Sequence, residues 1–280
     1  MKRSAATPQP LRKFPGRLVL LGAGKMGFAM LEGWLARGLD PRKLTILEPQ
    51  PAKAVRALTR RGVALNPKSG SPNVTAVVIA VKPQNAPDAI GALAPFVGKS
   101  TLALSIMAGR TLRFLEERLP PQTAIVRAMP NTPASIARGI TVACPNARVS
   151  ARQRRQASDL LAAIGKVEWT DDEALMDAVT ALSGSGPAYI FLLAEAMANA
   201  GIAAGLPPAL ATRLARETVA GSGELLNRSD LDHVTLRENV TSPGGTTAAA
   251  LDILMGPGGF DELLTRAIAA ATQRSRDLAG

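Results

Sequence analysis

Short apolar segments alternate with longer amphipathic ones over the first 170 residues of the chain. The run Thr75–Val81 is rich in β-branched residues and apolar after its first position, as expected for a strand buried on both faces. Similar runs occur at Arg17–Gly22, Leu44–Glu48, Thr101–Ile106, Ala124–Met129, Ile140–Cys144 and Lys166–Thr170. Segments of helical character follow the first two, at about Lys25–Arg37 and through Arg61. This alternation predicts a parallel, doubly wound sheet.

From about Asp171 the pattern becomes helical almost throughout. Gly/Pro-rich turns separate the segments Ala188–Gly201, Pro208–Asn227, Thr246–Leu254 and Phe260–Leu278. Helices this apolar need burial on more than one side. We therefore expect a homodimer whose helices interlock, with a single closed bundle as the alternative.

The amino-acid composition excludes several classes of protein and of site. Hydrophobic residues make up 46% of the 280 residues and aromatic residues 3%, so the core is expected to be mainly Ala, Leu, Val and Ile. The single cysteine, Cys144, cannot form an internal disulfide, which favours a reducing compartment and a cytoplasmic location. One histidine, His233, excludes a metal site built on several histidines. No run of about 18 apolar residues occurs, so no membrane-spanning helix is predicted.

The formal charge of +11 is partly local. Five cations lie within residues 1–17, no acid precedes Glu32, and three prolines interrupt the segment. We interpret residues 1–16 as a disordered basic extension without the apolar region of a secretory signal. Because no aromatic-interleaved or groove-entering motif accompanies the charge, we expect a solvated surface rather than a nucleic-acid partner. Salt-sensitive DNA binding by this extension remains a third-ranked alternative.

A glycine-rich turn follows the first predicted strand. Gly22, Gly24 and Gly27 match the pattern G-x-G-x-x-G, with Lys25 and Met26 between the last two glycines. The turn opens a predicted helix, so a pyrophosphate could approach the backbone closely and lie on the helix N-terminal N–H groups. The sequence therefore predicts an α/β fold: a Rossmann-type dinucleotide-binding domain at 17–170, followed by an all-α substrate and dimerisation domain at 171–280.

The end of the second strand bears on the choice of cofactor. Glu48 lies 21 residues after Gly27, where an acid accepts hydrogen bonds from the adenosine ribose and repels a 2′-phosphate. Lys53 and Arg56, on the next helix, could instead attract that phosphate. The choice between NADH and NADPH is open at this point.

Other strand ends are expected at the same edge of the sheet. Ala80, Val81, Lys82 and Pro83 follow the Thr75 strand, and Lys82 could contact ribose or phosphate oxygens. Met107, Ala108 and Gly109 follow the next strand and could wall the nicotinamide, although methionine is also ordinary core filler. Met129–Pro133 is a stiff turn that could shape the site.

The second domain carries a candidate anion cradle. Ser242, Gly244, Gly245, Thr246 and Thr247 precede an Ala-rich helix. Paired glycines expose backbone N–H groups and the helix start adds positive potential, an arrangement suited to a carboxylate or phosphate. The segment Ser183–Tyr189 lacks the spacing of a nucleophile elbow. We expect it to be a close-packed helix start near the substrate.

Over roughly residues 17–278 the chain resembles the pyrroline-5-carboxylate reductase family. The resemblance is carried by VTALSGSGPAY at 179–189 and LRENVTSPGGTT at 236–247, supported by AVKPQ at 80–84 and MPNTP at 129–133. It implies a Rossmann domain, a helical dimerisation domain and often a ring of five dimers, with NADPH as the usual cofactor and NADH in some members.

The resemblance also implies residue roles. Asn239 would lie near the cofactor, Gly245, Thr246 and Thr247 would hold the substrate carboxylate, and the Thr247 hydroxyl would lie near the ring nitrogen. Two positions depart from the family pattern. Asp232-His233-Val234 stands where members commonly have His-Pro, and Glu48 stands where NADP-preferring relatives carry uncharged or basic groups.

The available proton donors favour an imine substrate. Reduction of a ketone produces an alkoxide that needs a proton donor, and no lysine follows Lys166 in this chain. A cyclic imine can bind already protonated, so catalysis would be mostly positioning. The alternatives are a β-hydroxyacid dehydrogenase-like oxidoreductase and a non-catalytic dinucleotide-sensing protein.

Overall fold

The computed structural model describes residues 10–70 and 72–279. These residues form two compact units: residues 10–70, 72–184 and 272–279 belong to the first, and residues 185–271 form the second. The first unit extends past the boundary expected near residue 171. Arg127 Nη1 lies 2.8 Å from Glu173 Oε1, and Met176 is fully buried, so this segment packs with the sheet that precedes it.

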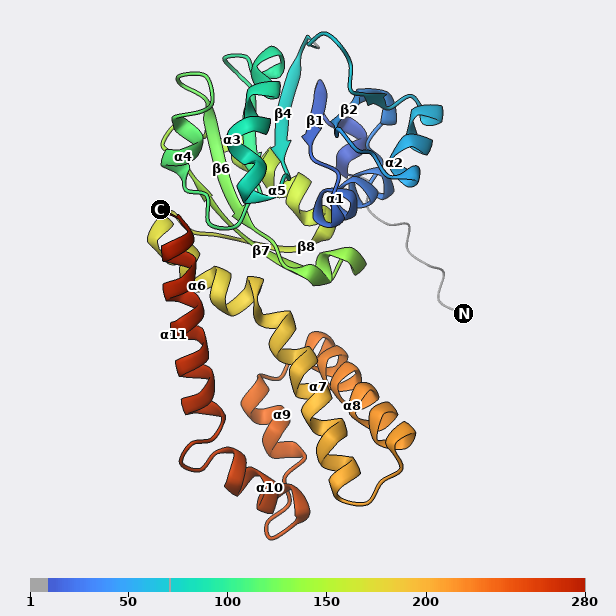
Figure 1. The fold of residues 1–280 in the computed structure, drawn as a ribbon, viewed down its shortest axis with the longest axis vertical. Helices are drawn as coiled ribbons and strands as arrows, with labels where there is room; N and C mark the ends of the chain where they lie inside the picture. Colours follow the sequence, from blue (N-terminus) through green and yellow to red (C-terminus); the bar gives the residue numbers. More distant parts are fainter. Residues whose placement is uncertain (1–9, 71, 280) are drawn as a thin grey trace. The chain divides into compact units, whose positions relative to one another are not determined.

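The first unit is built on one eight-stranded sheet (Figure 1). Its strands are β1 (Arg17–Leu21), β2 (Leu44–Leu47), β3 (Ala64–Leu65), β4 (Val74–Ile79), β5 (Leu102–Ser105), β6 (Ala124–Met129), β7 (Gly139–Pro145) and β8 (Gly165–Trp169). Their order across the sheet is β3-β2-β1-β4-β5-β6-β7-β8. The predicted alternation of strand and helix is confirmed, while the two-residue β3 was not anticipated.

The last two strands correct the prediction of a wholly parallel sheet. β7 pairs antiparallel with β6, and β8 then runs parallel to β7. The physical reason is the length of the connection. A parallel crossover needs a dozen or more residues, and only residues 130–138 lie between β6 and β7. The chain therefore turns back beside β6.

Helices cover both faces of the sheet. The α-helices of the first unit are α1 (Lys25–Ala36), α2 (Lys53–Ala57), α3 (Ala86–Ala89), α4 (Leu112–Glu116), α5 (Ala151–Leu161) and α6 (Met176–Val179). One face packs against α1 and α5, where Trp34 Nε1 donates to the carbonyl of Leu160. The other packs against α3, the 3₁₀ segment Ile90–Phe96 and α4. Apolar residues at alternate positions of the strands supply these two core clusters.

The prediction of a disordered extension over residues 1–16 is wrong for residues 10–16. Residues 1–9 lie outside the described residues, but residues 10–16 fold onto the first unit. Leu11 and Phe14 are buried in the core, and Lys43 Nζ donates to the carbonyl of Phe14. The cost of ordering this segment is offset by the two apolar side chains that it buries. In the sequence, Leu11 and Phe14 stand among basic residues and prolines, a composition that is typical of a disordered segment.

The second unit is entirely helical. It contains α7 (Gly186–Ala203), α8 (Pro208–Arg228), α9 (His233–Asn239), α10 (Thr246–Leu254) and the first part of α11 (Phe260–Ala279). Ala211 and Ala215 are buried against α7, yet Ile190, Phe191 and Leu225 are exposed. A unit that leaves so much apolar surface uncovered is suited to self-association. In the described ranges no helix is long and apolar enough to cross a membrane.

Cys144 of β7 is 1% exposed, and burial, followed by the nearby Glu173 carboxylate, raises the pKa of its thiol from 9.0 to about 11. Since the thiolate is the nucleophile, we expect the folded protein to react with iodoacetamide at pH 8 at least ~100-fold more slowly than the urea-unfolded chain. Mass spectrometry would follow the labelling, and comparable rates in the two states would contradict the expectation. Because the folded pKa is raised, the associated stability is complete below pH 9 and is lost towards pH 11.

Candidate functional site

The candidate cofactor site lies at the point where the order of the strands reverses. β1 pairs with β2 on one side and with β4 on the other, so the connections from β1 and from β4 leave in opposite directions. In open α/β sheets a crevice forms outside the carboxyl ends of the strands at such a point. The three strand ends at Leu21, Leu47 and Ile79 are therefore the place to look for a ligand.

The glycine turn has the geometry that close approach of a phosphate requires. Gly22 has φ +89°, and a Cβ there would lie 2.8 Å from the Ala80 carbonyl oxygen. A Cβ on Gly27 would overlap the carbonyl oxygen of Gly22, so this glycine lets α1 pack against the turn. Gly24 differs, because a Cβ there would meet nothing within 4 Å. Gly24 is the N-cap of α1 and has no side chain to cap it, so the first N–H groups of the helix receive no hydrogen bond from an N-cap side chain.

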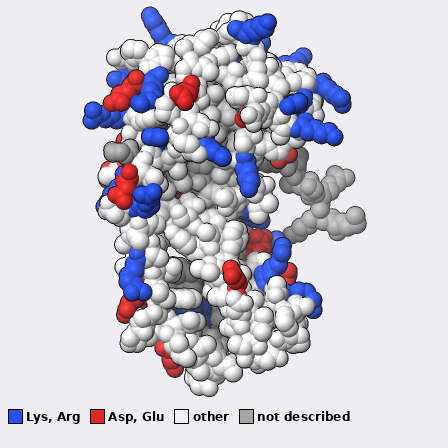
Figure 2. Space-filling view, viewed as in Figure 1, with Lys and Arg blue, Asp and Glu red and all other residues white. Residues whose placement is uncertain are grey.

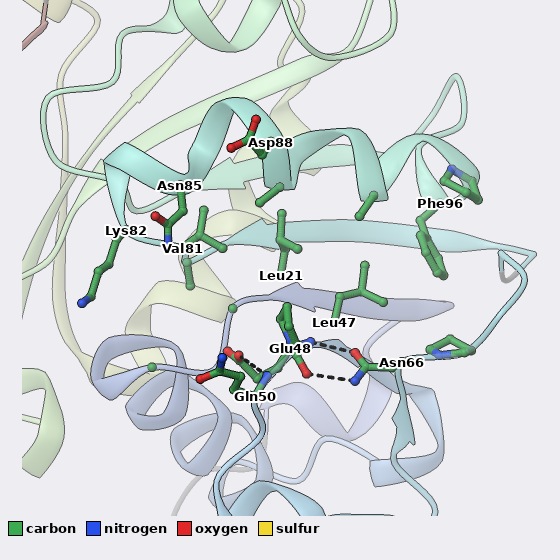
Figure 3. Close-up of a pocket in the computed structure, with 18 of the residues that line it drawn as sticks. Leu21, Leu47, Glu48, Gln50, Asn66, Val81, Lys82, Asn85, Asp88 and Phe96 are labelled. Atoms are coloured by element: carbon green, nitrogen blue, oxygen red, sulfur yellow. Dashed lines mark hydrogen bonds between the residues drawn. The ribbon is translucent and has the colours of Figure 1, made fainter.

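A cleft of about 1040 Å³ opens beside this turn (Figure 3). Six of the predicted cofactor residues line it: Gly22, Gly24, Glu48, Ala80, Val81 and Lys82. Leu21, Leu47 and Phe96 give it apolar walls, and Lys68 and Lys82 supply positive charge. Open backbone N–H groups, apolar walls and two lysines suit an adenine nucleotide with a pyrophosphate. The residues present therefore fit the predicted dinucleotide.

Glu48 forms hydrogen bonds in the cleft with two neighbouring turns. Its Oε2 accepts the Ala23 N–H at 2.9 Å, and its Oε1 accepts the Gln50 N–H at 3.0 Å. Asn66, at the end of β3, pairs with the Glu48 backbone through both atoms of its amide, as the dashed lines of Figure 3 show. Asn66 was not predicted from the sequence. An Asn-Pro pair such as that at 66–67 favours a turn, but only the fold brings this turn beside Glu48.

The remaining predicted cofactor residues of the first unit lie around the cleft without lining it. Lys25 is exposed at the start of α1, and Met26 packs partly against the core. Arg110 donates to the carbonyl of Pro83 at 2.9 Å and so ties two strand-end loops together. Met107 is only 2% exposed and packs in the core, while Ala108 and Gly109 follow it in the loop. Contact of these residues with a nicotinamide stays a prediction.

Positive charge is not gathered at one place on the visible surface. Figure 2 shows Lys and Arg side chains dispersed over the first unit on this face, with carboxylates among them. Several arginines form exposed ion pairs, including Arg113 with Glu117 and Arg148 with Glu116. Exposed pairs of this kind are usually worth less than about 1 kcal/mol. The described surface of this face therefore resembles a solvated arginine-rich surface.

The predicted substrate loop precedes α10 in the second unit. Gly245 is the N-cap of α10 and donates its N–H to the Ser242 carbonyl at 3.0 Å, while Gly244 has φ +68°. The N-cap residue has no side chain, so the first N–H groups of α10 receive no hydrogen bond from an N-cap side chain. Thr246 is exposed and Thr247 half-buried at the start of the helix. The loop thus has the form that a carboxylate cradle needs, and its role stays a prediction.

The helix before this loop ends at the predicted cofactor residue Asn239, which is exposed. Asp232 caps α9 by accepting the N–H groups of Thr235 and Val234, and these hydrogen bonds, with that of the Thr235 hydroxyl, hold the pKa of its carboxyl below the usual value. His233, the first residue of α9, is exposed. The helix therefore begins at a strong cap.

The two remaining family-like motifs meet inside the first unit. Thr180–Gly184 forms a π-helix, and Asn131 Nδ2 lies 3.4 Å from the Ser183 hydroxyl. Asn131 Oδ1 also accepts the Ile140 N–H at 3.0 Å, which fixes the turn after β6. Single π-turns are often found at functional sites. The helix that was expected to start within Ser183–Tyr189 begins at Gly186 in the structure.

These features define the class of protein. A sheet with a switch point, a glycine turn that leaves helix N–H groups open and a nucleotide-sized cleft are those of a dinucleotide-binding oxidoreductase. A family model described as NADP oxidoreductase, coenzyme F420-dependent, matches residues 17–109. A second, described as pyrroline-5-carboxylate reductase dimerisation, matches residues 173–278.

The chain belongs to the pyrroline-5-carboxylate reductase family. The pyrroline-5-carboxylate reductase of Pseudomonas aeruginosa is 40% identical over 266 residues, which cover 94% of this chain and 97% of the relative. That of Mycobacterium tuberculosis is 38% identical over 286 residues, covering 94% and 96%. The family suggested by the sequence motifs is thereby confirmed.

Solved structures agree over both units. The pyrroline-5-carboxylate reductase of Coxiella burnetii matches with a TM-score of 0.85 at 33% identity and covers 95% of this chain and 99% of its own. A Plasmodium falciparum pyrroline carboxylate reductase with NADP bound matches with a TM-score of 0.78 at 28% identity, covering 98% and 100%. The protein is thus an oxidoreductase with a pyridine nucleotide cofactor and a dimerisation domain, which confirms the predicted fold class.

Proposed function

We propose that this protein reduces 1-pyrroline-5-carboxylate to L-proline with NADPH or NADH, the last step of proline biosynthesis. The observation that carries the proposal is the pairing, in one chain, of the nucleotide cleft at the switch point with the SPGGTT loop before α10. When bound, the cofactor supplies the hydride. The chain's own residues bind and orient the two reactants.

The loop at 242–247 holds the substrate carboxylate in this proposal. The N–H groups at the start of α10 have no side-chain cap, and charge-assisted hydrogen bonds typically contribute about 1.5–3 kcal/mol each. A few such bonds can hold a carboxylate without an arginine. Thr247 then orients the ring nitrogen, and the imine carbon receives hydride while the nitrogen already carries its proton. No lysine is needed, in keeping with the absence of lysine after Lys166.

The assembly proposed is a homodimer formed through the second unit, with a decamer of five dimers as the larger form. The exposed apolar side chains of α7 and α8 support self-association. A cytoplasmic location is proposed from the single cysteine, which cannot form an internal disulfide. Sedimentation at several protein concentrations would distinguish monomer, dimer and decamer.

A steady-state assay tests the activity directly. Chemically prepared pyrroline-5-carboxylate is offered with NADH and with NADPH, and the product is identified as proline. β-Hydroxy acids with the oxidised cofactors serve as the competing substrates. Turnover of hydroxy acids alone would favour the dehydrogenase alternative, and nucleotide binding without turnover of either substrate would favour a sensing protein.

Replacing Thr247 by alanine is expected to lower kcat/KM for pyrroline-5-carboxylate about tenfold, because one hydrogen bond worth about 1–1.5 kcal/mol is lost. The Kd for the nucleotide should hardly change. Thr247→Ser retains the hydroxyl and should keep most of the activity, so it is the matched control. Unchanged turnover in Thr247→Ala would refute the role of the hydroxyl.

A further inference from the structure

Asn66 fixes the backbone of Glu48 by a paired amide contact. The Glu48 N–H donates to Asn66 Oδ1 at 2.8 Å, and Asn66 Nδ2 donates to the Glu48 carbonyl at 2.8 Å. Asn66 itself has φ +47° and donates its N–H to the Ile46 carbonyl at 2.8 Å. Asparagine tolerates this left-handed conformation better than most residues. The position of Glu48 is therefore set by a side chain from the neighbouring strand.

The Glu48 carboxylate is equally fixed. Each oxygen accepts one backbone N–H, from Ala23 of the glycine turn and from Gln50 of the next turn. An ionised carboxylate has about four lone-pair sites, so acceptor capacity remains for ribose hydroxyls. The negative charge is held on the lining of the cleft, beside the strand end where the adenosine ribose of a dinucleotide lies in such folds.

The cations that could neutralise a 2′-phosphate are less well placed. No arginine lines the cleft within residues 10–70 and 72–279. Arg56 Nε is bonded to the Pro51 carbonyl, and Lys53 is exposed on α2. Lys68 and Lys82 do line the cleft, but both are exposed, flexible point charges, whereas planar bidentate arginine is the residue suited to phosphate. The fixed carboxylate therefore dominates the charge that a phosphate would meet.

We propose that Glu48, positioned by Asn66, makes this protein select NADH over NADPH. The inference rests on the proposed function, since it concerns the cofactor of the same reaction. A phosphate group carries about −1.5 to −2 charge at pH 7, and bringing it beside a fixed carboxylate is unfavourable. The 2′-hydroxyl of NADH instead donates to that carboxylate. Asn66 is a positioning residue that acts through Glu48.

Two measurements test the proposal. Fluorescence titration gives Kd for NADH and for NADPH without substrate, and steady-state assays give kcat/KM for each cofactor. We expect the wild-type protein to bind NADH at least tenfold more tightly than NADPH. Glu48→Gln keeps an oxygen for the Ala23 N–H but removes the charge, so the ratio of the two Kd values should fall at least tenfold, chiefly through tighter NADPH binding.

Asn66→Gly tests the positioning role, because glycine tolerates the positive φ and removes only the amide contact. In this variant the ratio of the Kd for NADPH to the Kd for NADH should fall about threefold or more. Asn73→Gly is the matched control, since Asn73 also has a positive φ (+58°) and does not line the cleft. Its ratio should equal that of the wild type. If Asn66 had a purely structural role, Asn66→Gly would weaken the binding of NADH and NADPH equally and leave the ratio of their Kd values unchanged.

The outcomes separate this inference from the proposed function. Tighter binding of NADPH than NADH by the wild-type protein, or an unchanged ratio in Glu48→Gln, would overturn the inference even if pyrroline-5-carboxylate is reduced. Preferential NADH binding that Glu48→Gln abolishes would support it even if pyrroline-5-carboxylate is not a substrate. The titration measures selection without any turnover.

Discussion

Replacing Gly24 by valine is expected to weaken dinucleotide binding by about 100-fold while the first unit remains folded. A Cβ at Gly24 would meet no protein atom within 4 Å, so a valine side chain is expected to project into the cleft where the pyrophosphate approaches the backbone. Losing one or two charge-assisted hydrogen bonds, at about 1.5–3 kcal/mol each, corresponds to this change in Kd. Fluorescence titration with NADH and NADPH measures it.

The stability of the same variant distinguishes a blocked site from a misfolded one. Valine is a poorer N-cap than glycine, so this replacement is expected to lower the free energy of unfolding by about 1 kcal/mol or less. Both tryptophans, Trp34 and Trp169, belong to the first unit, so urea unfolding followed by their fluorescence reports on it. Gly91→Val is the control, because Gly91 also has open space around it and does not line the cleft. Normal nucleotide affinity in Gly24→Val would contradict the assignment of the cleft.

Gly165→Ala is expected to destabilise the first unit by about 3–5 kcal/mol. Gly165 begins β8 with φ +146°, a conformation available almost only to glycine and costing other residues about 1–3 kcal/mol. A Cβ there would also overlap the backbone of Gly139, its register partner on β7. Neither strand can move freely within the sheet, so overpacking adds about 1–3 kcal/mol. The urea midpoint from tryptophan fluorescence should fall accordingly.

A second glycine separates the two causes. Gly109 has φ +67°, but a Cβ there would be 3.8 Å from Leu278, an ordinary contact. Gly109→Ala should therefore cost only the backbone strain of about 1–2 kcal/mol. If Gly165→Ala costs no more than Gly109→Ala, the close approach of β7 and β8 does not limit the stability of this unit.

The cofactor motif could be predicted from the sequence because its geometry depends only on residues that are close together in the chain. A strand, a glycine-rich turn and a helix start within residues 17–27 bring their own backbone N–H groups together, whatever the rest of the chain does. The SPGGTT loop is readable for the same reason. In both places the structure has a helix whose N-cap is glycine and which lacks a side-chain cap.

Other parts of the site depend on neighbours that are distant in sequence. Asn66 was missed because its partner, Glu48, lies across a strand pair rather than along the chain. Met107 could be predicted from the sequence either as a wall for the nicotinamide or as core filler; it packs in the core, and its contact with a nicotinamide stays a prediction. Leu11 and Phe14 were assigned to a disordered extension because charge outweighed two apolar residues in the pattern.

The sequence alone predicted most of the strands and helices in their order, the family, and the two glycine-rich turns that each begin a helix without a side-chain cap. These depend on periodicity, glycine and local hydrogen bonding, which act over a few residues. Only the tertiary structure decided that β7 runs against β6, that residues 171–184 pack with the sheet, and that Asn66 fixes the backbone of Glu48 beside the cleft. Those features follow from packing and pairing between segments far apart in the chain, so a local sequence pattern does not predict them.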